Sequence, residues 1–214
     1  MGKIYTSMGL MSGTSLDGVD VSIIKSDGNR EISSILNGYF EYDQELIKKI
    51  LNIREKITHP ERLNKHSDEI KDLEREVTLF HVKAVKETLE KFKSSVDFIG
   101  FHGQTIFHDS EKKISKQIGD GKLLSQLTKK KVIYNFRKND LENGGQGAPL
   151  TPIFHNVLAN KIDKKFSLGF PLNILNIGGI SNITSTIRWE NFGRIDKIYA
   201  FDIGPGNCLI DEWI

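Results

Sequence analysis

Two glycine-rich turns, each set between apolar strands, constrain this chain more than any other feature. The first runs through Gly13-Thr14-Ser15-Leu16-Asp17-Gly18 and the second through Gly178-Gly179. A short turn with glycine N–H groups and neighbouring hydroxyls is able to hold phosphate oxygens. Two such turns facing each other across a cleft would enclose the phosphates of a nucleoside triphosphate.

The bulk composition is that of an ordinary globular protein. The chain has 214 residues, of which 38% are hydrophobic and 27% charged, and its net charge is only +2. This charge argues against nucleic acid and against an acidic membrane surface as partners. Cys208 is the single cysteine, so no internal disulfide forms and a cytoplasmic location fits best. We find no apolar signal segment and no stretch of transmembrane length.

The first half of the chain predicts three strands followed by helices. Strands are expected over 4–10, 19–26 and 32–42. Asp43 is a suitable N-cap for a helix over 44–57, and Pro60 is placed to begin a long helix that reaches Phe92. Apolar residues recur at three- and four-residue steps through that helix, which is typical of one buried face.

The second half alternates strands and helices and then returns to strands. Strands are expected over 96–101, 113–118 and 132–136, with helices over 123–129 and 150–160, and residues 137–147 are expected to form a polar loop. A polar, Gly- and Pro-punctuated stretch over 162–171 suggests a domain boundary. The expected domains are therefore residues 1–168 and 169–214. The second opens with strands at 172–177, 182–187 and 197–203, which repeats the opening of the first.

The first turn has the chemistry of a phosphate and metal site. Five polar side chains fall within nine residues: Ser12, Thr14, Ser15, Asp17 and Asp20. Hydroxyls and backbone N–H groups take phosphate oxygens, and a carboxylate holds Mg²⁺ directly or through water. The sequence contains no Walker-type loop, no Gly-x-Gly-x-x-Gly and no nucleophile elbow. An ordinary hairpin turn is the alternative interpretation.

Two further segments carry candidate groups, each with a structural alternative. Asp202 follows an apolar strand and precedes Gly204-Pro205-Gly206, which aims a carboxylate from a rigid support, or it caps a helix that begins near Asn207. The loop over 144–149 either allows close backbone approach to a ligand, with the Gln146 amide beside it, or is a flexible connector. We interpret His102 and His155 as structural, and no histidine or cysteine has zinc-site spacing.

These segments together resemble a known family. The block Gly9–Gly18 is similar to the signature of the anhydro-N-acetylmuramic acid kinases, which belong to the actin/hexokinase/Hsp70-like ATPases. Further blocks follow in the family's order over the whole chain: His102–Thr105, Gln117–Asp120, Gly144–Leu150, Asn176–Asn182 and Phe201–Asn207. One departure is Asn135, because the family usually has aspartate before Phe-Arg at this point.

The resemblance implies an α/β fold with a complete actin-like (ribonuclease H-like) first lobe and the opening strands of a second. It implies ATP and Mg²⁺ as cofactors, with Mg²⁺ assigned to Asp17. It also implies that Asp202 is the general base, which deprotonates the water that opens a 1,6-anhydro sugar while O6 receives the γ-phosphoryl group. The implied phosphate-binding residues are Gly13, Thr14, Ser15, Leu16, Asp17, Gly18, Val19, Asp20, Gly178 and Gly179. The implied sugar-binding residues are Gln104, Thr105, Arg137, Asp140 and Gln146.

The length of the chain raises a second hypothesis. Because family members are much longer, the resemblance predicts a second lobe that is only begun, without its adenosine-binding part. The chain is then either the N-terminal part of an active amino-sugar kinase or an inactive remnant. A third form of the same idea is a split kinase that needs a separately encoded C-terminal half. The expected partners are a small amino sugar and either this second half or another copy of the chain.

Overall fold

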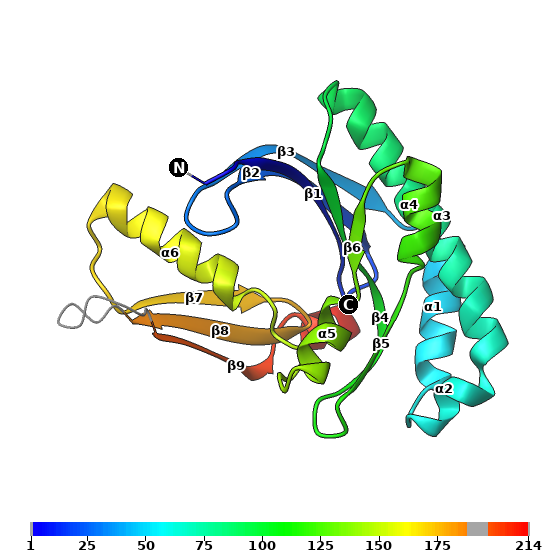
Figure 1. The fold of residues 1–214 in the computed structure, drawn as a ribbon. Coiled ribbons are helices and arrows are strands. Elements are labelled where there is room, and N and C mark those ends of the chain that lie inside the picture. Colours follow the sequence, from blue (N-terminus) through cyan, green and yellow to red (C-terminus); the bar gives the residue numbers. More distant parts are fainter. Residues whose placement is uncertain (1, 188–196, 214) are drawn as a thin grey trace. The chain divides into compact units, whose positions relative to one another are not determined.

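A computed structural model describes residues 2–187 and 197–213 of the chain (Figure 1). The chain divides into two compact units, Met1–Gly147 and Ala148–Ile214. Both are mixtures of helices and strands, which confirms the α/β class.

Unit 1 opens with an antiparallel meander that contains the first turn. The strands are β1 (Tyr5–Ser12), β2 (Gly18–Ser26) and β3 (Ile32–Glu41), paired in that order. The alternating pattern of β2 buries Val19, Val21 and Ile23 and leaves Asp20 on the other face. The turn between β1 and β2 is therefore held between two strands whose inward side chains belong to the core.

A long central strand brings a second sequence block to the first turn. Strand β4 (Phe98–Asp109) runs parallel to β1, with Ser12 opposite Gln104. Its other edge pairs with β6 (Val132–Tyr134) in parallel and with β5 (Ile114–Ile118) in an antiparallel hairpin. Because the carboxyl ends of parallel strands meet at one edge of a sheet, the end of β1 and the His102–Thr105 block lie together.

The helices that accompany this sheet include α1 (Gln44–Lys56), α2 (Glu61–Lys65), α3 (Ser67–Phe92) and α4 (Gly121–Thr128) (Figure 1). As predicted, Asp43 caps α1, since its Oδ1 accepts a hydrogen bond from Leu46 N at 2.8 Å. The long helix predicted from Pro60 is interrupted, because His66 leaves helical geometry between α2 and α3.

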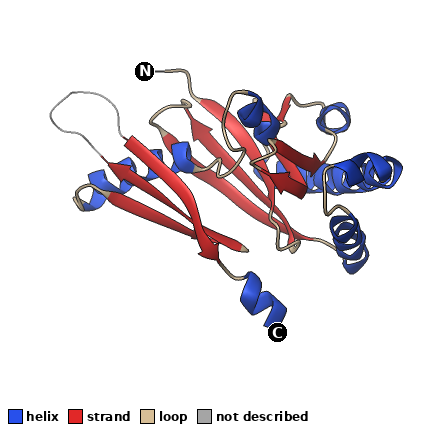
Figure 2. Cartoon of the chain, turned by 90° about the horizontal axis from the view of Figure 1, so that it is seen from below, coloured by secondary structure: helices blue, strands red, loops and turns tan. Residues whose placement is uncertain are grey.

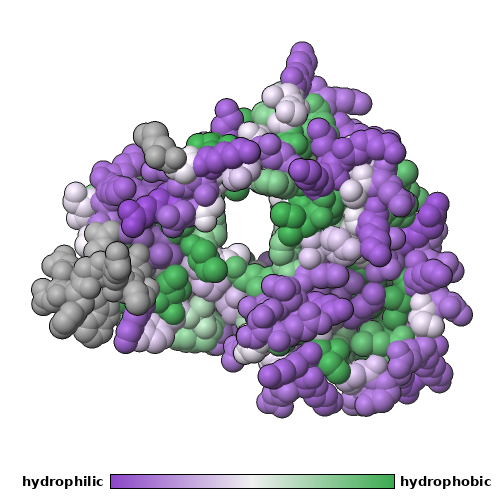
Figure 3. Space-filling model, in the orientation of Figure 1, coloured by the Kyte–Doolittle hydropathy of each residue, from purple (hydrophilic) through white to green (hydrophobic). Residues whose placement is uncertain are grey.

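The core of unit 1 lies between the sheet and these helices. Its buried members come mainly from β1, β2, β4, α1 and α3, and include Met8, Ile23, Ile50, Val77 and Ile99, all without solvent exposure. Strand β3 adds two partly buried side chains, Leu36 and Phe40. Around the helical side of this unit the surface is mainly hydrophilic (Figure 3). The first turn therefore lies at the end of strands that pack into this core.

Unit 2 is a three-stranded antiparallel sheet with a helix against it (Figure 2). The elements are α6 (Pro152–Phe166), β7 (Leu172–Ile177), β8 (Ile180–Ile187), β9 (Lys197–Pro205) and α7 (Cys208–Trp213). Pro152 occupies the first turn of α6, where its missing N–H costs nothing. His155 on α6 lies 2.7 Å from the Thr184 hydroxyl of β8, through its Nδ1, and both side chains are buried.

The division between the units differs from the predicted boundary at 168/169. It lies after Gly147, because α6 packs on β7, β8 and β9 and so joins the second sheet. The stretch expected to be a polar loop over 137–147 also contains a helix, α5 (Phe136–Glu142). Asn135 precedes it in left-handed geometry with φ 63°. Asparagine is among the non-glycine residues that adopt this geometry most readily.

Candidate phosphate and sugar site

The first turn presents polar groups outward and an apolar side chain inward. Thr14, Ser15 and Asp17 are exposed, whereas Leu16, with φ 62°, is 2% exposed and inserts into the core. The Ser15 hydroxyl donates a hydrogen bond to Asp17 Oδ1 at 2.8 Å. A buried leucine in the middle of a polar turn fixes which way the turn faces.

The end of the turn packs tightly against β3. A Cβ on Gly18 would lie 2.2 Å from the Phe40 carbonyl oxygen, so no larger residue fits there without a backbone shift. The Asp17 carbonyl accepts two hydrogen bonds, from Tyr42 N at 3.1 Å and from the Tyr39 hydroxyl at 2.8 Å. Packing against β3 alone therefore requires glycine at position 18.

Two side chains from distant parts of unit 1 hold the start of the turn. Gln104 Nε2 donates to the Gly13 carbonyl at 2.9 Å, and Arg54 Nη1 donates to the Thr14 carbonyl at 3.0 Å. The Gln104 side chain has no solvent exposure in this structure, and its amide is engaged by the turn. Its Oε1 is buried without a hydrogen-bond partner among the described residues.

A buried histidine lies beneath the same turn. His81 Nδ1 is 2.7 Å from the Val77 carbonyl and its Nε2 is 3.0 Å from the Ser12 hydroxyl. A carbonyl only accepts, so Nδ1 carries the proton and Ser12 donates to Nε2. Burial lowers the pKa of His81 to about 4, which keeps the ring neutral near pH 7. The last residue of β1 is thereby tied to the middle of α3.

The carboxylates of the first turn are suited to a magnesium ion that arrives with a nucleotide. Burial raises the pKa of Asp20, and repulsion from the neighbouring Asp17 carboxylate raises it further. The two carboxylates are therefore close enough to interact electrostatically. No group of three or more His, Cys, Asp or Glu side chains suited to a metal occurs among residues 2–187 and 197–213. Magnesium commonly takes one or two carboxylates together with substrate phosphates and water, so this donor set fits it.

The predicted sugar residues gather around Arg137 on α5. Arg137 Nε donates to His102 Nε2 at 3.3 Å and its Nη1 donates to the Gly147 carbonyl at 2.8 Å. The Thr105 hydroxyl is 3.5 Å from the same imidazole nitrogen. Burial, with smaller contributions from Arg137 and His81, lowers the pKa of His102 to about 4. A neutral His102 is therefore the acceptor that orients Arg137.

Asp140 shapes the glycine-rich loop that follows α5. Its Oδ2 accepts from Gly147 N at 2.7 Å, and its carbonyl accepts from Gly145 N at 2.8 Å. A Cβ on Gly145 would lie 2.0 Å from Asp140 Oδ2, so only glycine passes this close to the carboxylate. Gln146 is exposed at the tip of the loop. The structure thus brings Thr105, Arg137, Asp140 and the Gln146 loop together within unit 1.

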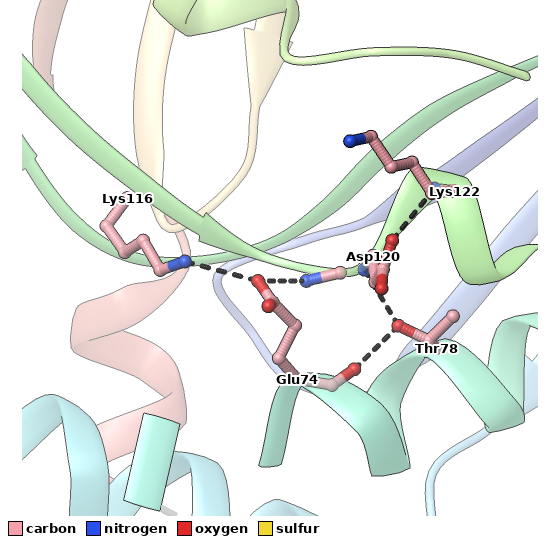
Figure 4. Close-up of polar contacts among 6 residues, drawn as sticks. Glu74, Thr78, Lys116, Asp120 and Lys122 are labelled. Atoms are coloured by element: carbon pink, nitrogen blue, oxygen red, sulfur yellow. Dashed lines mark hydrogen bonds and ion pairs between the residues drawn. The ribbon is translucent and has the colours of Figure 1, made fainter. Parts of the chain in front are cut away.

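The Gln117–Asp120 block is attached to α3 by a polar network (Figure 4). Glu74 Oε1 accepts from Lys116 Nζ at 3.1 Å and from Gly119 N at 3.3 Å. Thr78 Oγ1 accepts from Asp120 N at 2.8 Å while donating to the Glu74 carbonyl at 2.6 Å. The Asp120 carboxylate accepts from Lys122 N at 2.8 Å as the cap of α4. This block has a structural role that its composition alone does not reveal.

The second turn is held by backbone groups from the segment that follows β9. Gly206 N donates to the Gly179 carbonyl and Asn207 N to the Gly178 carbonyl, both at 2.8 Å. A Cβ on Gly206 would lie 1.9 Å from the Gly178 oxygen, which explains the glycine there. Both carbonyls of the Gly178-Gly179 turn are therefore occupied within unit 2.

Asp202 lies inside β9 and not at the end of the strand. It pairs with Asn182 of β8 and its side chain is exposed. The strand continues to Pro205 and α7 begins at Cys208, so Asp202 does not cap that helix.

Sequence reasoning missed several groups that build the site in unit 1: Tyr39, Arg54, His81 and, as an acceptor for Arg137, His102. Each acts across a long sequence separation, and the Arg54 contact joins residues 40 apart. Only His102 had a local signal, because it opens the His102–Thr105 block.

Within the described part of the chain, no helix has both the length and the apolarity to cross a bilayer.

Comparisons with known proteins place these features in one family. A family model described as "Anhydro-N-acetylmuramic acid kinase" matches residues 5–214. A relative of the same description from Pelagibacter ubique is 56% identical over 216 residues, covering 100% of this chain and 55% of the relative. One from Agrobacterium fabrum is 40% identical, covering 100% and 56%, and one from Gluconobacter oxydans is 42% identical, covering 97% and 55%. The chain thus spans about 55% of the length of these relatives.

Proposed function

Because the chain belongs to the anhydro-N-acetylmuramic acid kinase family, we propose that it forms the phosphate- and sugar-binding part of an ATP-dependent amino-sugar kinase. The observation that carries this proposal is the first turn. The turn exposes hydroxyls and a carboxylate. Its backbone carbonyls accept four hydrogen bonds, from the side chains of Gln104, Arg54 and Tyr39 and from the backbone N–H of Tyr42. A prearranged turn of this kind is what phosphoryl transfer demands, since positioning does most of its work.

In this proposal the turn over Gly13–Asp20, in unit 1, and the Gly178-Gly179 turn, in unit 2, are each a phosphate-binding element. Asp17, with Asp20 beside it, holds Mg²⁺, which neutralises charge on the phosphates when it is bound. Thr14 and Ser15 donate to phosphate oxygens from the exposed side of the turn. Gln104 acts through the turn, because its amide donates to the Gly13 carbonyl.

The sugar is assigned to the cluster around Arg137. Thr105, Asp140 and Gln146 offer hydroxyl, carboxylate and amide groups that match the hydroxyl and acetamido groups of an amino sugar. The proposed substrate is 1,6-anhydro-N-acetylmuramic acid. His102 keeps Arg137 in place by accepting from its Nε.

Asp202 is the proposed general base. Its carboxylate removes a proton from water, and the water oxygen bonds to the anomeric carbon while the bond from that carbon to O6 breaks. O6 then takes the γ-phosphoryl group of ATP, which gives N-acetylmuramic acid 6-phosphate and ADP. This product would enter the recycling of cell-wall sugars in the cytoplasm. A general base contributes about 10²–10⁴-fold to such a rate.

The test is ATP-dependent phosphorylation of the anhydro sugar, followed by mass spectrometry of the product. Asp202→Asn is compared with Asp72→Asn, which makes the same change at an exposed position of α3. We expect Asp202→Asn to lose turnover and Asp72→Asn to retain the turnover of the wild type. Because the chain spans about 55% of its relatives, the assay is run with the 214-residue chain and with a form extended to the relatives' length.

The two forms separate the competing hypotheses. Turnover by both, abolished by Asp202→Asn, excludes an inactive remnant. Turnover by the extended form alone means that the chain needs a second part, supplied in one polypeptide or as a separately encoded partner. No phosphorylated product from a folded, extended form contradicts the proposal.

A further inference from the structure

We propose that Arg54, which no motif singles out, supplies the positive charge of the phosphate site by contacting the polyphosphate beside the first turn. The inference rests on the proposed phosphate role of that turn. It adds a phosphate-binding residue from helix α1, a part of the chain outside all the blocks that carry the family resemblance.

The turn has no positive charge of its own. Residues 12–24 contain no lysine or arginine, whereas Asp17 and Asp20 contribute two carboxylates. A polyphosphate brought to this turn is repelled by those carboxylates unless a cation intervenes. Mg²⁺ offsets part of that repulsion, and a fixed cation on the protein would offset more without having to be recruited.

Arg54 is placed to be that cation. Its Nη1 donates to the Thr14 carbonyl at 3.0 Å, so the guanidinium lies against the exposed part of the turn. The helix that carries it is firmly seated, because Ile50 and Ile53 on the same helix have no solvent exposure. A guanidinium has five N–H donors, and the Thr14 carbonyl takes one of them.

Arg54 differs from the nearby Lys56 in its ion pairing. Lys56, two residues further along α1, forms an ion pair with Glu69 at 2.6 Å. Among the described residues no carboxylate lies within ion-pair distance of Arg54. Arg54 is also only half-buried, so it keeps access to a ligand. A planar guanidinium suits phosphate oxygens because it donates two parallel hydrogen bonds.

The probe is inorganic tripolyphosphate, followed by calorimetry and by phosphorus NMR on the 214-residue chain, with Mg²⁺–ATP as the second ligand. Arg54→Gln keeps a hydrogen-bond donor for Thr14 but removes the charge, and Arg54→Lys keeps the charge. Lys48→Gln is the control, since it removes one charge from an exposed position of the same helix. Thermal midpoints are measured for every variant.

We expect Arg54→Gln to weaken tripolyphosphate binding about 10-fold at low ionic strength, the usual loss for one charge-assisted hydrogen bond. Arg54→Lys should retain most of the affinity, and Lys48→Gln should bind like the wild type. The difference between wild type and Arg54→Gln should shrink at about 1 M salt, where the screening length falls to about 3 Å.

Three results would overturn the inference. Equal binding by Arg54→Gln and wild type contradicts it while leaving the phosphate role of the turn intact. Equal losses in Arg54→Gln and Arg54→Lys that persist at high salt mean that Arg54 only braces the backbone. Absence of tripolyphosphate and ATP binding by the folded wild-type chain removes the proposed role of the turn and this inference with it.

Discussion

The two glycine turns are held in different ways, although both join antiparallel strands. The first is fixed by side chains that come from other elements, Gln104 on β4 and Arg54 on α1. The second is fixed by backbone N–H groups of Gly206 and Asn207, which lie on the segment directly after β9. The first turn is held from distant elements of its unit, and the second is held by the segment that follows the third strand of its own sheet.

The sheets that carry the two turns also differ in how deeply their apolar side chains are buried. Met8 and Ile23 beside the first turn have no solvent exposure, whereas Ile177 and Phe201 beside the second are 64% and 56% exposed. Burial of one apolar side chain contributes about 1.5–3 kcal/mol, so the first turn rests on the more strongly stabilised support. The geometry of the first turn is therefore tied to the global stability of unit 1.

The largest expected effect comes from the glycines that are crowded by carbonyl oxygens. Gly18→Ala drives a methyl group against Phe40 O, and we expect unit 1 to lose about 3 kcal/mol or more of unfolding free energy. Gly206→Ala creates a similar clash with Gly178 O, and we expect it to disturb only unit 2, where the segment after β9 meets the Gly178-Gly179 turn. Urea unfolding and amide hydrogen exchange measure both. A drop in the stability of unit 1 with Gly206→Ala would break the comparison.

Acid should weaken unit 1 through two neutral histidines, the buried His81 and the half-buried His102. His81 and His102 have pKa values near 4 in the folded protein against 6.5 for an ordinary histidine. Below pH 6.5 the unfolded chain binds more protons than the folded chain. The free energy of unfolding therefore decreases as the pH is lowered from 6.5 to about 4. Between pH 6.5 and about 5.5 the two groups together remove about 2 kcal/mol.

The measurement is urea unfolding over this pH range for wild type, His102→Gln and His59→Gln. His102→Gln keeps an acceptor for Arg137 and should halve the pH dependence, while His59→Gln changes an exposed ring and should leave it unchanged. An undiminished slope in His102→Gln would show that its burial does not depress its pKa.

The smallest effect is expected from the side chain that joins β4 to the turn. Gln104→Leu keeps the buried volume but removes the donor to the Gly13 carbonyl, at a cost of about 1 kcal/mol in stability. Phosphate binding should suffer more than stability does, because the turn loses a fixed backbone position. Gln126→Leu, at an exposed position of α4, is the matched control. Unchanged tripolyphosphate affinity would mean that the turn keeps its shape without Gln104.

Local signals predicted much of the fold. The strands beside the first turn and the Asp43 cap of α1 lie where residue patterns placed them, since turn and cap chemistry depend on neighbours in sequence. The break at His66 was not predicted, because the apolar spacing continues across it. Helix α5 was missed since its residues are largely polar and lack an apolar face. The domain boundary moved because packing of α6 on β8, and not composition, decides it.

The candidate site was predictable in its motifs and not in its supports. Thr105, Arg137 and Asp140 were predicted to belong together, and they do lie in one cluster. Gln104 was predicted as a sugar ligand, and only the structure reveals that it is wholly buried. Arg54 and His81 gave no signal, because their partners on the turn lie 40 and 69 residues away.

The parallel pairing of β1 with β4 has a consequence for how the chain acquires its shape during synthesis. Gly13 and Gln104 are 91 residues apart, so at about 5–20 residues per second the ribosome releases the second roughly 5–18 s after the first. Through that interval β1 has an unpaired edge and its turn lacks the Gln104 contact. A chain at this stage offers a strand edge to any neighbour, and holding it apart until β4 appears is work suited to a chaperone.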